Sequence, residues 1–457
     1  MSEEIENIQF ELTDDLVNQV ERLIESKSDK ELHTLLDDFH YADIAEILDE
    51  LDLDEAVYII KLLDSDTTSD ILTELDEDIR EKVLKNLSAK EIAEEVEELD
   101  TDDAADIISE LPERRRQEVI SKIEDEEHKA EITELLAYDD DSAGGLMAKE
   151  LVKVYDTWTV AGCLRRIRGQ AEEVTRVHSV YVVNKEEKLV GRLSLKDLIV
   201  AKNEQKIEDI YISNVDYVNV YDDAEDVAKI MSKYDLEAIP VVDNNQTLVG
   251  RITIDDIVDV LKEEADKDYQ LAAGITQDVD SDDSIIELTR ARLPWLFLGL
   301  VGGIGAFIIM YYFEGNLPDE ALILFLFTPL IAAMAGNVGV QSSAIIVQGL
   351  ANDDVKGSIN SRLIKEMLLA ALNGVILSVF LFLFVFAWEQ RFDLALAISV
   401  SLVIVIIIAG LIGTFIPLFL DRRGIDPAIA TGPFITTSND IFGIVIYLMI
   451  AKLILGI

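Results

Sequence analysis

The chain of 457 residues contains little cysteine, little histidine and few positive charges. Its single cysteine, Cys163, excludes an internal disulfide and any metal site built from several thiolates. Four scattered histidines argue against a zinc site, and 39 basic against 89 acidic residues argue against nucleic acid as a partner. The chain opens without a basic start or an apolar run, so no signal peptide is expected.

The acidic excess is confined to the first two thirds of the chain. Residues 1–292 hold 78 acidic and 32 basic residues, which gives −46, whereas residues 293–457 hold 11 and 7, which gives −4. A chain of this length needs several domains. An excess of carboxylates favours solubility or cations as partners. We therefore expect an acidic, water-exposed part joined to a nearly neutral, apolar part.

The first 140 residues contain an apolar repeat with a period of 12. Two apolar series run three residues apart and so share one face of a helix, and the polar residues that follow can cap the next helix. Such short helices cannot bury an apolar face alone, so we predict a solenoid from about Asp29 to Tyr138. The first series is Phe39, Leu51, Leu63, Leu75, Leu87, Leu99, Leu111, Ile123 and Leu135; the second is Leu36, Leu48, Ile60, Leu72, Leu84, Val96, Ile108, Ile120 and Ile132; the caps are Asp52, Asp64, Asp76, Ser88 and Asp100.

A second repeat, with an offset of 59 residues, follows the solenoid. Tyr181 to Leu198 and Pro240 to Ile257 each contain two alternating apolar runs separated by a polar turn. This pattern predicts a strand, a hairpin turn, a strand and a helix. The pair resembles tandem CBS domains over residues 145–262. CBS pairs bind nucleotides in other proteins, but no residue pattern here specifies such a site, so ATP is left open as a ligand.

An acidic connecting segment follows the second repeat. We predict a helix from Val258 that reaches at least Gly274 and extends toward Thr289. Asp256, Asp259 and Glu263 follow a spacing of three and seven residues and so share a face of this helix. Like charges on one helix face are destabilising unless cations neutralise them. This face is therefore either simply solvated or a cation site, and its place just before the apolar segments favours a cation site.

Five apolar segments complete the chain, and each can cross a hydrocarbon core of roughly 30 Å. The loops on one side of these segments are basic, and the alternate loops, Glu314–Glu320 and Glu389–Asp393, hold only Arg391. The excess of basic residues predicts cytoplasmic N-terminal domains and an extracellular C-terminus. The segments are Pro294–Phe313, Ala321–Leu350, Lys365–Trp388, Ala395–Leu420 and Gly432–Leu455; the basic residues are Arg290, Arg292, Lys356, Arg362, Lys365, Arg422 and Arg423.

Polar residues inside two of the segments indicate ion chemistry. Asn337 and Gln341 are one helical turn apart in the second segment, between small residues that allow close helix packing. Asp440 lies in the fifth, where a carboxylate at membrane depth marks a functional site by default. Asp426 precedes it by 14 residues, on the same azimuth if the backbone stays helical, roughly 20 Å away. Thr436 and its neighbours surround Asp440 with oxygens, which suits a hydrated hard cation such as Mg²⁺.

The order of these parts resembles the MgtE family of magnesium channels over essentially the whole chain. The most specific matches are Gly336-Asn337-x-Gly339-x-Gln341 and Asp426-Pro427-Ala428 followed by Gly432-Pro433 and Asp440; Ser142 to Met147 also fits. The resemblance implies an all-α superhelical N-terminal domain (residues 1–140), α/β tandem CBS domains (141–262), an acidic connecting or plug helix (263–290) and a five-helix transmembrane domain (291–457).

The resemblance also implies a homodimer in the cell membrane with one pore on the two-fold axis. Asp440 would be the ion-selective carboxylate, with Asn337, Gln341 and Thr436 near it and Asp426 at the cytoplasmic end. Cytoplasmic Mg²⁺ bound between the helical domain, the CBS pair and the plug helix would close the pore. The ligands chosen for this regulatory role are Asp102, Asp106, Asp256, Asp259, Glu263 and Glu264.

Three other functions remain open on sequence alone. A transporter of Co²⁺ or Mn²⁺ is disfavoured because no His, Cys or Met surrounds Asp440. A CBS-regulated anion channel would need basic residues or helix N-termini at membrane depth, and none are visible. A membrane-anchored adenylate sensor or enzyme would need a nucleophile and base or a phosphate-binding glycine loop, and none is apparent, so the chain is not expected to be an enzyme.

Overall fold

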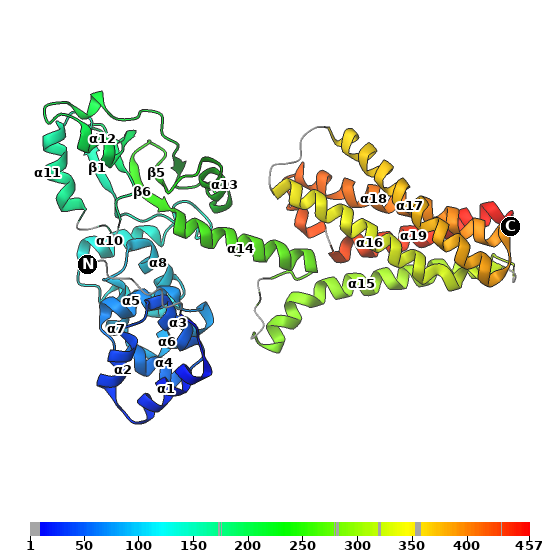
Figure 1. Ribbon diagram of the computed structural model, residues 1–457, viewed down its shortest axis with the longest axis horizontal. Coiled ribbons are helices and arrows are strands. Elements are labelled where there is room, and N and C mark those ends of the chain that lie inside the picture. Colours follow the sequence, from blue (N-terminus) through cyan, green and yellow to red (C-terminus); the bar gives the residue numbers. More distant parts are fainter. Residues whose placement is uncertain are drawn as a thin grey trace, which may run out of the picture. The chain divides into compact units, whose positions relative to one another are not determined.

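The computed structural model describes residues 10–171, 174, 176–277, 279, 283–318, 321–351, 358–430 and 432–457. It forms two compact units, Met1–Leu261 and Lys262–Ile457. Figure 1 shows the elements of both units coloured along the chain. Lys356, one of the basic residues used to predict sidedness, lies outside the described residues.

The first unit begins with ten short helices in its described part. Most of them start at an Asp or Ser N-cap; Ser88, for example, accepts the backbone N–H of Glu91 at 3.2 Å. All five predicted caps occupy N-cap positions, as predicted. The helices are α1 (Asp14–Glu25), α2 (Asp29–Leu36), α3 (Tyr41–Asp49), α4 (Leu53–Ile60), α5 (Ser65–Glu74), α6 (Glu77–Asn86), α7 (Ala89–Val96), α8 (Thr101–Ser109), α9 (Glu113–Ile120) and α10 (Glu126–Leu135).

The two apolar series occupy different positions in these helices. Residues of the second series, such as Leu48 and Val96, end helices or lie near their ends, and all but Ile120 are buried. Most residues of the first series lie just beyond the helix, as Leu51 and Leu99 do. The prediction that both series share a helix face is therefore wrong for most repeats: the helix ends between them, because the polar cap of the next helix follows at once.

The two CBS-like repeats each form a three-stranded sheet with helices. In each sheet the first strand is parallel to the second, and the second is antiparallel to the third, as the hairpin pattern predicts. The first repeat contains β1 (Val152–Tyr155), α11 (Val160–Gln170), β2 (Val180–Val183), β3 (Leu189–Leu193), α12 (Leu195–Val200) and the 3₁₀ turn η1 (Ile207–Asp209). The second contains β4 (Val218–Asn219), α13 (Ala224–Tyr234), β5 (Ala238–Val242), β6 (Leu248–Thr253) and the start of α14 (Ile254–Ala273).

The connecting helix is shorter than the sequence predicts. α14 ends at Ala273 because Gly274 takes a φ of +83°, which is left-handed and terminates a helix. Thr289 belongs instead to the next helix, α15, which starts at Ile285 after an N-cap at Ser284. The predicted connection of residues 263–290 is thus two helices separated by a break.

Five long apolar helices follow, each long enough to cross a membrane. The prediction of a five-helix transmembrane domain is confirmed. The described helices are α15 (Ile285–Glu314), α16 (Leu324–Ala351), α17 (Ile359–Glu389), α18 (Phe392–Asp421) and α19 (Gly432–Leu455), with the 3₁₀ turn η3 (Pro427–Ala430) before the last.

Glycines bring α16, α18 and α19 close together. A Cβ on Gly339 of α16 would overlap the Asn439 amide of α19, and a Cβ on Gly413 of α18 would overlap the Gly339 carbonyl. Small residues allow such backbone contact between membrane helices. The small-residue face of the second apolar segment therefore packs within the same chain.

Candidate ion-binding sites

A groove between α16 and α19 collects four of the five predicted pore residues. Its volume is about 440 Å³. A single carboxylate, two amides and one hydroxyl supply its polar groups, and no basic residue lines it in the described part of the chain. The lining residues are Ala332, Ala333, Gly336, Asn337, Val340, Gln341, Thr436 and Asp440.

Helix geometry explains why these side chains meet. Asn337 and Gln341 are four residues apart on α16, and Thr436 and Asp440 are four apart on α19, so each pair forms a stripe on one helix face. Gly336 lies where the stripes approach: a Cβ there would be 3.3 Å from Thr436 Cγ2 and 3.8 Å from Asp440 Oδ1. Asp440 is half-buried, about 12 Å along α19 from Gly432.

Two polar side chains on α19 have other contacts. The hydroxyl of Thr436 donates to the carbonyl of Gly432 at 2.9 Å, so its proton is used within α19 while its oxygen still offers lone pairs. Asn439 is buried against Gly339, and neither its Nδ2 nor its Oδ1 has a hydrogen-bond partner among the described residues. Asn439 therefore packs between helices and does not line the groove.

Asp426 is not on the helix that carries Asp440. It is exposed and caps η3, accepting the backbone N–H of Ala428 at 2.7 Å. The prediction of a shared helical azimuth is wrong, because α19 begins only at Gly432, where φ is +38° and a proline follows. The structure does not bring Asp426 into the groove.

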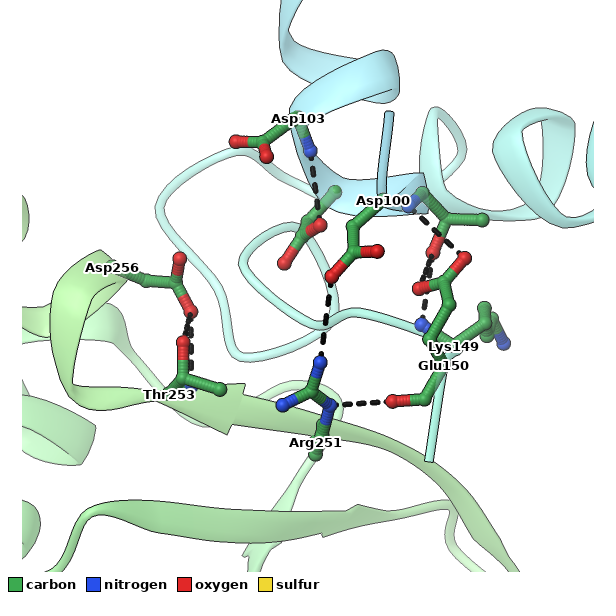
Figure 2. A network of polar contacts seen from close by, with 9 residues as sticks. Asp100, Asp103, Lys149, Glu150, Arg251, Thr253 and Asp256 are labelled. Carbon is green, nitrogen blue, oxygen red and sulfur yellow. Dashed lines mark hydrogen bonds and ion pairs between the residues drawn. The ribbon is translucent and has the colours of Figure 1, made fainter. Parts of the chain in front are cut away.

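A second candidate site is a partly buried group of carboxylates in the first unit, with Asp102 buried at its centre and Asp106 exposed. Asp100 is the N-cap of α8, Asp102 and Asp103 occupy its first turn, and Asp256 lies in the first turn of α14 (Figure 2). Glu150 joins them from the segment before β1. One oxygen each of Asp100, Asp102 and Glu150 lies within 4.8 Å of the others. We call Asp100, Asp102, Asp103, Asp106, Glu150 and Asp256 the acidic cluster.

Hydrogen bonds hold these carboxylates in place. Glu150 accepts the backbone N–H and the hydroxyl of Thr101 at 3.2 and 2.9 Å. Asp256 accepts the same two groups of Thr253 at 2.9 and 2.8 Å. Arg251 is paired with Asp100 at 3.4 Å and donates to the Glu150 carbonyl. The helix N-termini account for some of this acidity, since they attract negative charge.

The cluster nevertheless carries more negative charge than its surroundings neutralise. Burial and then the Asp256 carboxylate raise the pKa of Asp103 to about 7. Burial and then Asp140 and Asp256 raise the pKa of Asp106 to about 7. Burial also raises the pKa of Asp256 to about 6 and that of Asp102 well above its usual value. A bound cation would reduce the repulsion among these carboxylates and stabilise their charged forms.

The other predicted regulatory residues are on the surface of α14. Asp259 and Glu263 are exposed, and Glu264 is paired with Lys267 at 2.8 Å. Sequence analysis missed Asp103 and Glu150 and recognised Asp100 only as a cap. A signal for Asp103 was its place in the first turn of a predicted helix, whereas nothing local marked Glu150.

Small cavities of about 30 and 10 Å³ lie in the CBS pair. The larger is lined in part by Tyr181, Arg192 and Asp216. Burial raises the pKa of Tyr181 to about 12, so its phenol is neutral. Neither cavity reaches the roughly 300 Å³ typical of a small-molecule site. Cys163 is buried in this pair, which raises its pKa to about 11 and agrees with a core role.

Comparisons with known proteins match the predicted solenoid, the CBS repeats and most of the apolar part of the chain. The family model described as "Divalent cation transporter" (MgtE) matches residues 328–450, that of the "MgtE intracellular N domain" matches 39–141, and that of the CBS domain matches 143–204 and 207–263. The chain is 35% identical to the magnesium transporter MgtE of Bacillus subtilis (strain 168) over 318 residues, which is 69% of this chain and 70% of that protein. It is 37% identical to the magnesium transporter MgtE of Enterococcus faecalis (strain ATCC 700802 / V583) over 321 residues, which is 70% of this chain and 70% of that protein.

Solved structures resemble the soluble part. The cytosolic domain of the Mg²⁺ channel MgtE in complex with ATP is 32% identical, with a TM-score of 0.51, and covers 53% of this chain and 99% of that one. The soluble part of a magnesium transporter is 30% identical, with a TM-score of 0.50, and covers 55% and 98%.

Proposed function

Because the chain belongs to the MgtE family of divalent cation transporters, we propose that it carries Mg²⁺ across a membrane through the groove between α16 and α19. The observation that supports this most directly is the placement of Asp440 beside Asn337, Gln341 and Thr436 in one groove. The groove offers only oxygen and amide groups, which suit a hard cation.

The groove is large enough for a hydrated ion. Six waters occupy roughly 180 Å³, and the groove holds about 440 Å³. Mg²⁺ dehydrates reluctantly and is usually bound through one or two carboxylates with several waters retained. We propose that Asp440 attracts the ion while Asn337, Gln341 and Thr436 bond to its waters. Co²⁺ and Mn²⁺ would gain no imidazole or thiolate here.

Mg²⁺ flux into proteoliposomes tests this assignment. Asp440→Ala and Asp440→Asn should each reduce flux at least tenfold or abolish selectivity for Mg²⁺ over Ca²⁺, because both remove the only charge in the groove. Asp393→Asn is a matched control, since Asp393 is an exposed carboxylate in the first turn of α18. Wild-type uptake and selectivity in both Asp440 variants would refute the groove as the ion path.

We also propose that two chains form the pore. The groove is open on one side of the single chain and contains one carboxylate, so a second copy facing it would enclose the path and add a second Asp440. The test is a cross-link between cysteines placed at the extracellular end of α19 in a Cys163→Ser background. A monomeric mass with flux intact after reconstitution at one chain per vesicle would contradict it.

Regulation by cytoplasmic Mg²⁺ forms the third part of the proposal. The acidic cluster, with Asp102, Asp106 and Asp256, would bind Mg²⁺ and join α8 to α14, and Asp259, Glu263 and Glu264 would add ligands from the α14 surface. α14 ends at the pore helix: the Ala272 carbonyl contacts Gly432, and Gly274 packs on Pro433. Bound Mg²⁺ would hold this helix as a plug and close the path. The N-terminal domains would then be cytoplasmic, with Asp426 at the cytoplasmic mouth and the C-terminus outside.

ATP is a candidate second ligand of the CBS pair. A related cytosolic domain was solved with ATP, and the cavity beside Tyr181 offers one guanidinium, from Arg192, and one carboxylate, from Asp216. The cavity of about 30 Å³ would have to open to admit a nucleotide. Calorimetry with ATP, comparing wild type with Arg192→Ala, tests this ligand.

A further inference from the structure

A histidine lies close to Glu150 of the acidic cluster. One ring nitrogen of His128 and one oxygen each of Glu131 and Glu150 lie within 4.8 Å of one another. His128 and Glu131 are three residues apart on α10 and therefore share a face of that helix. Glu150 comes from the segment before β1. Two separate parts of the first unit thus bring an imidazole and two carboxylates together.

A backbone contact fixes the imidazole ring. Nε2 of His128 lies 3.0 Å from the carbonyl oxygen of Val96, at the end of α7. A carbonyl only accepts, so Nε2 carries the proton and the lone pair is on Nδ1. Metal-binding histidines characteristically donate their other ring N–H to a backbone carbonyl or a carboxylate, which fixes the ring and its tautomer. Val96 lies outside the group of three and supplies this contact.

The two carboxylates are also restrained. Glu150 is fixed by its two bonds from Thr101, which use one lone pair on each oxygen and leave others free. Glu131 is half-buried and lies close to the Glu150 carboxylate, so two negative charges face each other. Lys149, the residue before Glu150, is paired with Glu134 at 2.7 Å. A dication between His128, Glu131 and Glu150 would relieve this repulsion.

We propose that His128, Glu131 and Glu150 form a binding site for a divalent first-row transition metal ion, of the Mn²⁺ or Zn²⁺ class. One imidazole with two carboxylates is a ligand set that such ions use in proteins, whereas Mg²⁺ takes oxygen ligands and keeps its waters. The site is separate from the ion groove and differs in chemistry from the acidic cluster, with which it shares Glu150.

The ion would link the helical domain to the CBS pair. His128 and Glu131 belong to the last helix before the CBS repeats, and Glu150 immediately precedes their first strand. Binding should therefore protect the segment between α10 and β1 from proteolysis, at ion concentrations well below those at which Mg²⁺ acts.

Electron paramagnetic resonance with Mn²⁺ tests the site on the full chain in detergent. An excess of Mg²⁺ of about a hundredfold should occupy oxygen-only sites and leave Mn²⁺ at this one. The expected result is one bound Mn²⁺ per chain with nitrogen coupling from an imidazole in the spin-echo spectrum. Bound Mn²⁺ without nitrogen coupling would overturn the proposal, and so would the absence of Mn²⁺ binding in excess Mg²⁺. Both results can be obtained with the wild-type protein alone.

Variants then identify the ligands. His128→Gln should abolish the nitrogen coupling and weaken Mn²⁺ binding at least tenfold, and Glu131→Gln should weaken it similarly while keeping the coupling. His33→Gln is the matched control, because His33 lies on α2 and pairs with Asp37 instead. Nitrogen coupling that persists in His128→Gln would assign the signal to another histidine and refute the site. Zn²⁺ should displace the bound Mn²⁺, and failure to do so would also contradict it.

Discussion

Glu366 is a second carboxylate among the apolar helices. It lies on α17 and accepts the hydroxyl of Ser342 on α16 at 2.6 Å. A Cβ on Gly410 of α18 would be 3.0 Å from the same Glu366 oxygen, so three helices meet there. Ser342 follows Gln341, which lines the groove. A polar contact between membrane helices contributes about 0.6 to 2 kcal/mol of stability. This contact links α16, which carries Asn337 and Gln341, to α17.

Substitutions at Glu366 should separate hydrogen bonding from charge. Glu366→Gln keeps an acceptor for Ser342 and should melt within about 2 °C of wild type, with normal Mg²⁺ flux. Glu366→Leu should cost about 1 kcal/mol, lower the melting temperature in detergent and reduce flux. Ser342→Ala should resemble Glu366→Leu. Equal loss in Glu366→Gln and Glu366→Leu would instead show that the negative charge matters.

The raised pKa values in the acidic cluster predict that protons compete with Mg²⁺. Asp103 and Asp106 have a pKa of about 7 and Asp256 of about 6, all above the unfolded value near 4. Without metal, the folded state binds more protons than the unfolded state between about pH 4 and 7, so stability should fall as pH rises through this window and level off above it.

A Mg²⁺ titration of the first unit, Met1–Leu261, at several pH values measures this competition. The Mg²⁺ concentration at half-maximal thermal stabilisation should rise as pH falls from 8 to 6, by up to about tenfold per unit for each proton displaced. Asp103→Asn with Asp106→Asn should flatten the dependence. A midpoint that does not change with pH would place the stabilising Mg²⁺ outside the acidic cluster.

At the scale of elements, the end of α14 and the start of α19 are in close contact within the second unit. Gly432 takes a left-handed φ of +38°, and a Cβ there would overlap the Ala272 carbonyl. Gly432→Ala should therefore strain the backbone and separate the two helix ends. We expect a channel that no longer closes fully in Mg²⁺, seen as residual flux at saturating cytoplasmic Mg²⁺.

A control distinguishes that effect from general damage. Gly424 also has a positive φ, of +66°, but a Cβ there would contact nothing within 4 Å. Gly424→Ala carries the backbone strain without the clash, so its closure should match wild type. If both variants close normally, the contact between Ala272 and Gly432 has no part in gating.

The existence of each helix could be predicted from the sequence more reliably than the residue at which the helix ends. The period of 12 and the Asp or Ser caps located the starts of five helices, since a cap makes a local hydrogen bond. Gly274 ended a helix that was predicted to extend toward Thr289, whereas the fifth apolar segment was predicted to begin at Gly432, where α19 does begin. Asn337, Gln341, Thr436 and Asp440 were found because a four-residue spacing fixes a helix face. Glu150 was missed because its partners lie far away in sequence.

For the whole molecule, net charge opposes compaction. The first 292 residues carry −46, and their carboxylates repel one another when cations are scarce. Mg²⁺ bound between the elements should therefore favour the compact form by mass action. Because several ions would act together, closure should be steep in Mg²⁺ concentration, and oxygen-only sites should bind weakly, near cellular free Mg²⁺.

General charge screening and specific Mg²⁺ binding predict different results. Comparing NaCl with MgCl₂ therefore tests whether the proposed regulatory Mg²⁺ sites exist. Monovalent salt at 0.1 M already screens exposed charges beyond about 10 Å, so screening alone should compact the chain in NaCl as well as in MgCl₂ at equal ionic strength. Specific sites predict that only Mg²⁺ protects the segment after α14 from proteolysis and closes the channel. Protection and closure should then increase together as Mg²⁺ is added.

Neutralising Asp259, Glu263 and Glu264 should shift the midpoints of protection and of closure to higher Mg²⁺. Neutralising the exposed Glu25, Glu31 and Asp54 removes the same charge and should shift neither. Equal protection by NaCl would reduce the effect to screening and leave Mg²⁺ without a regulatory site.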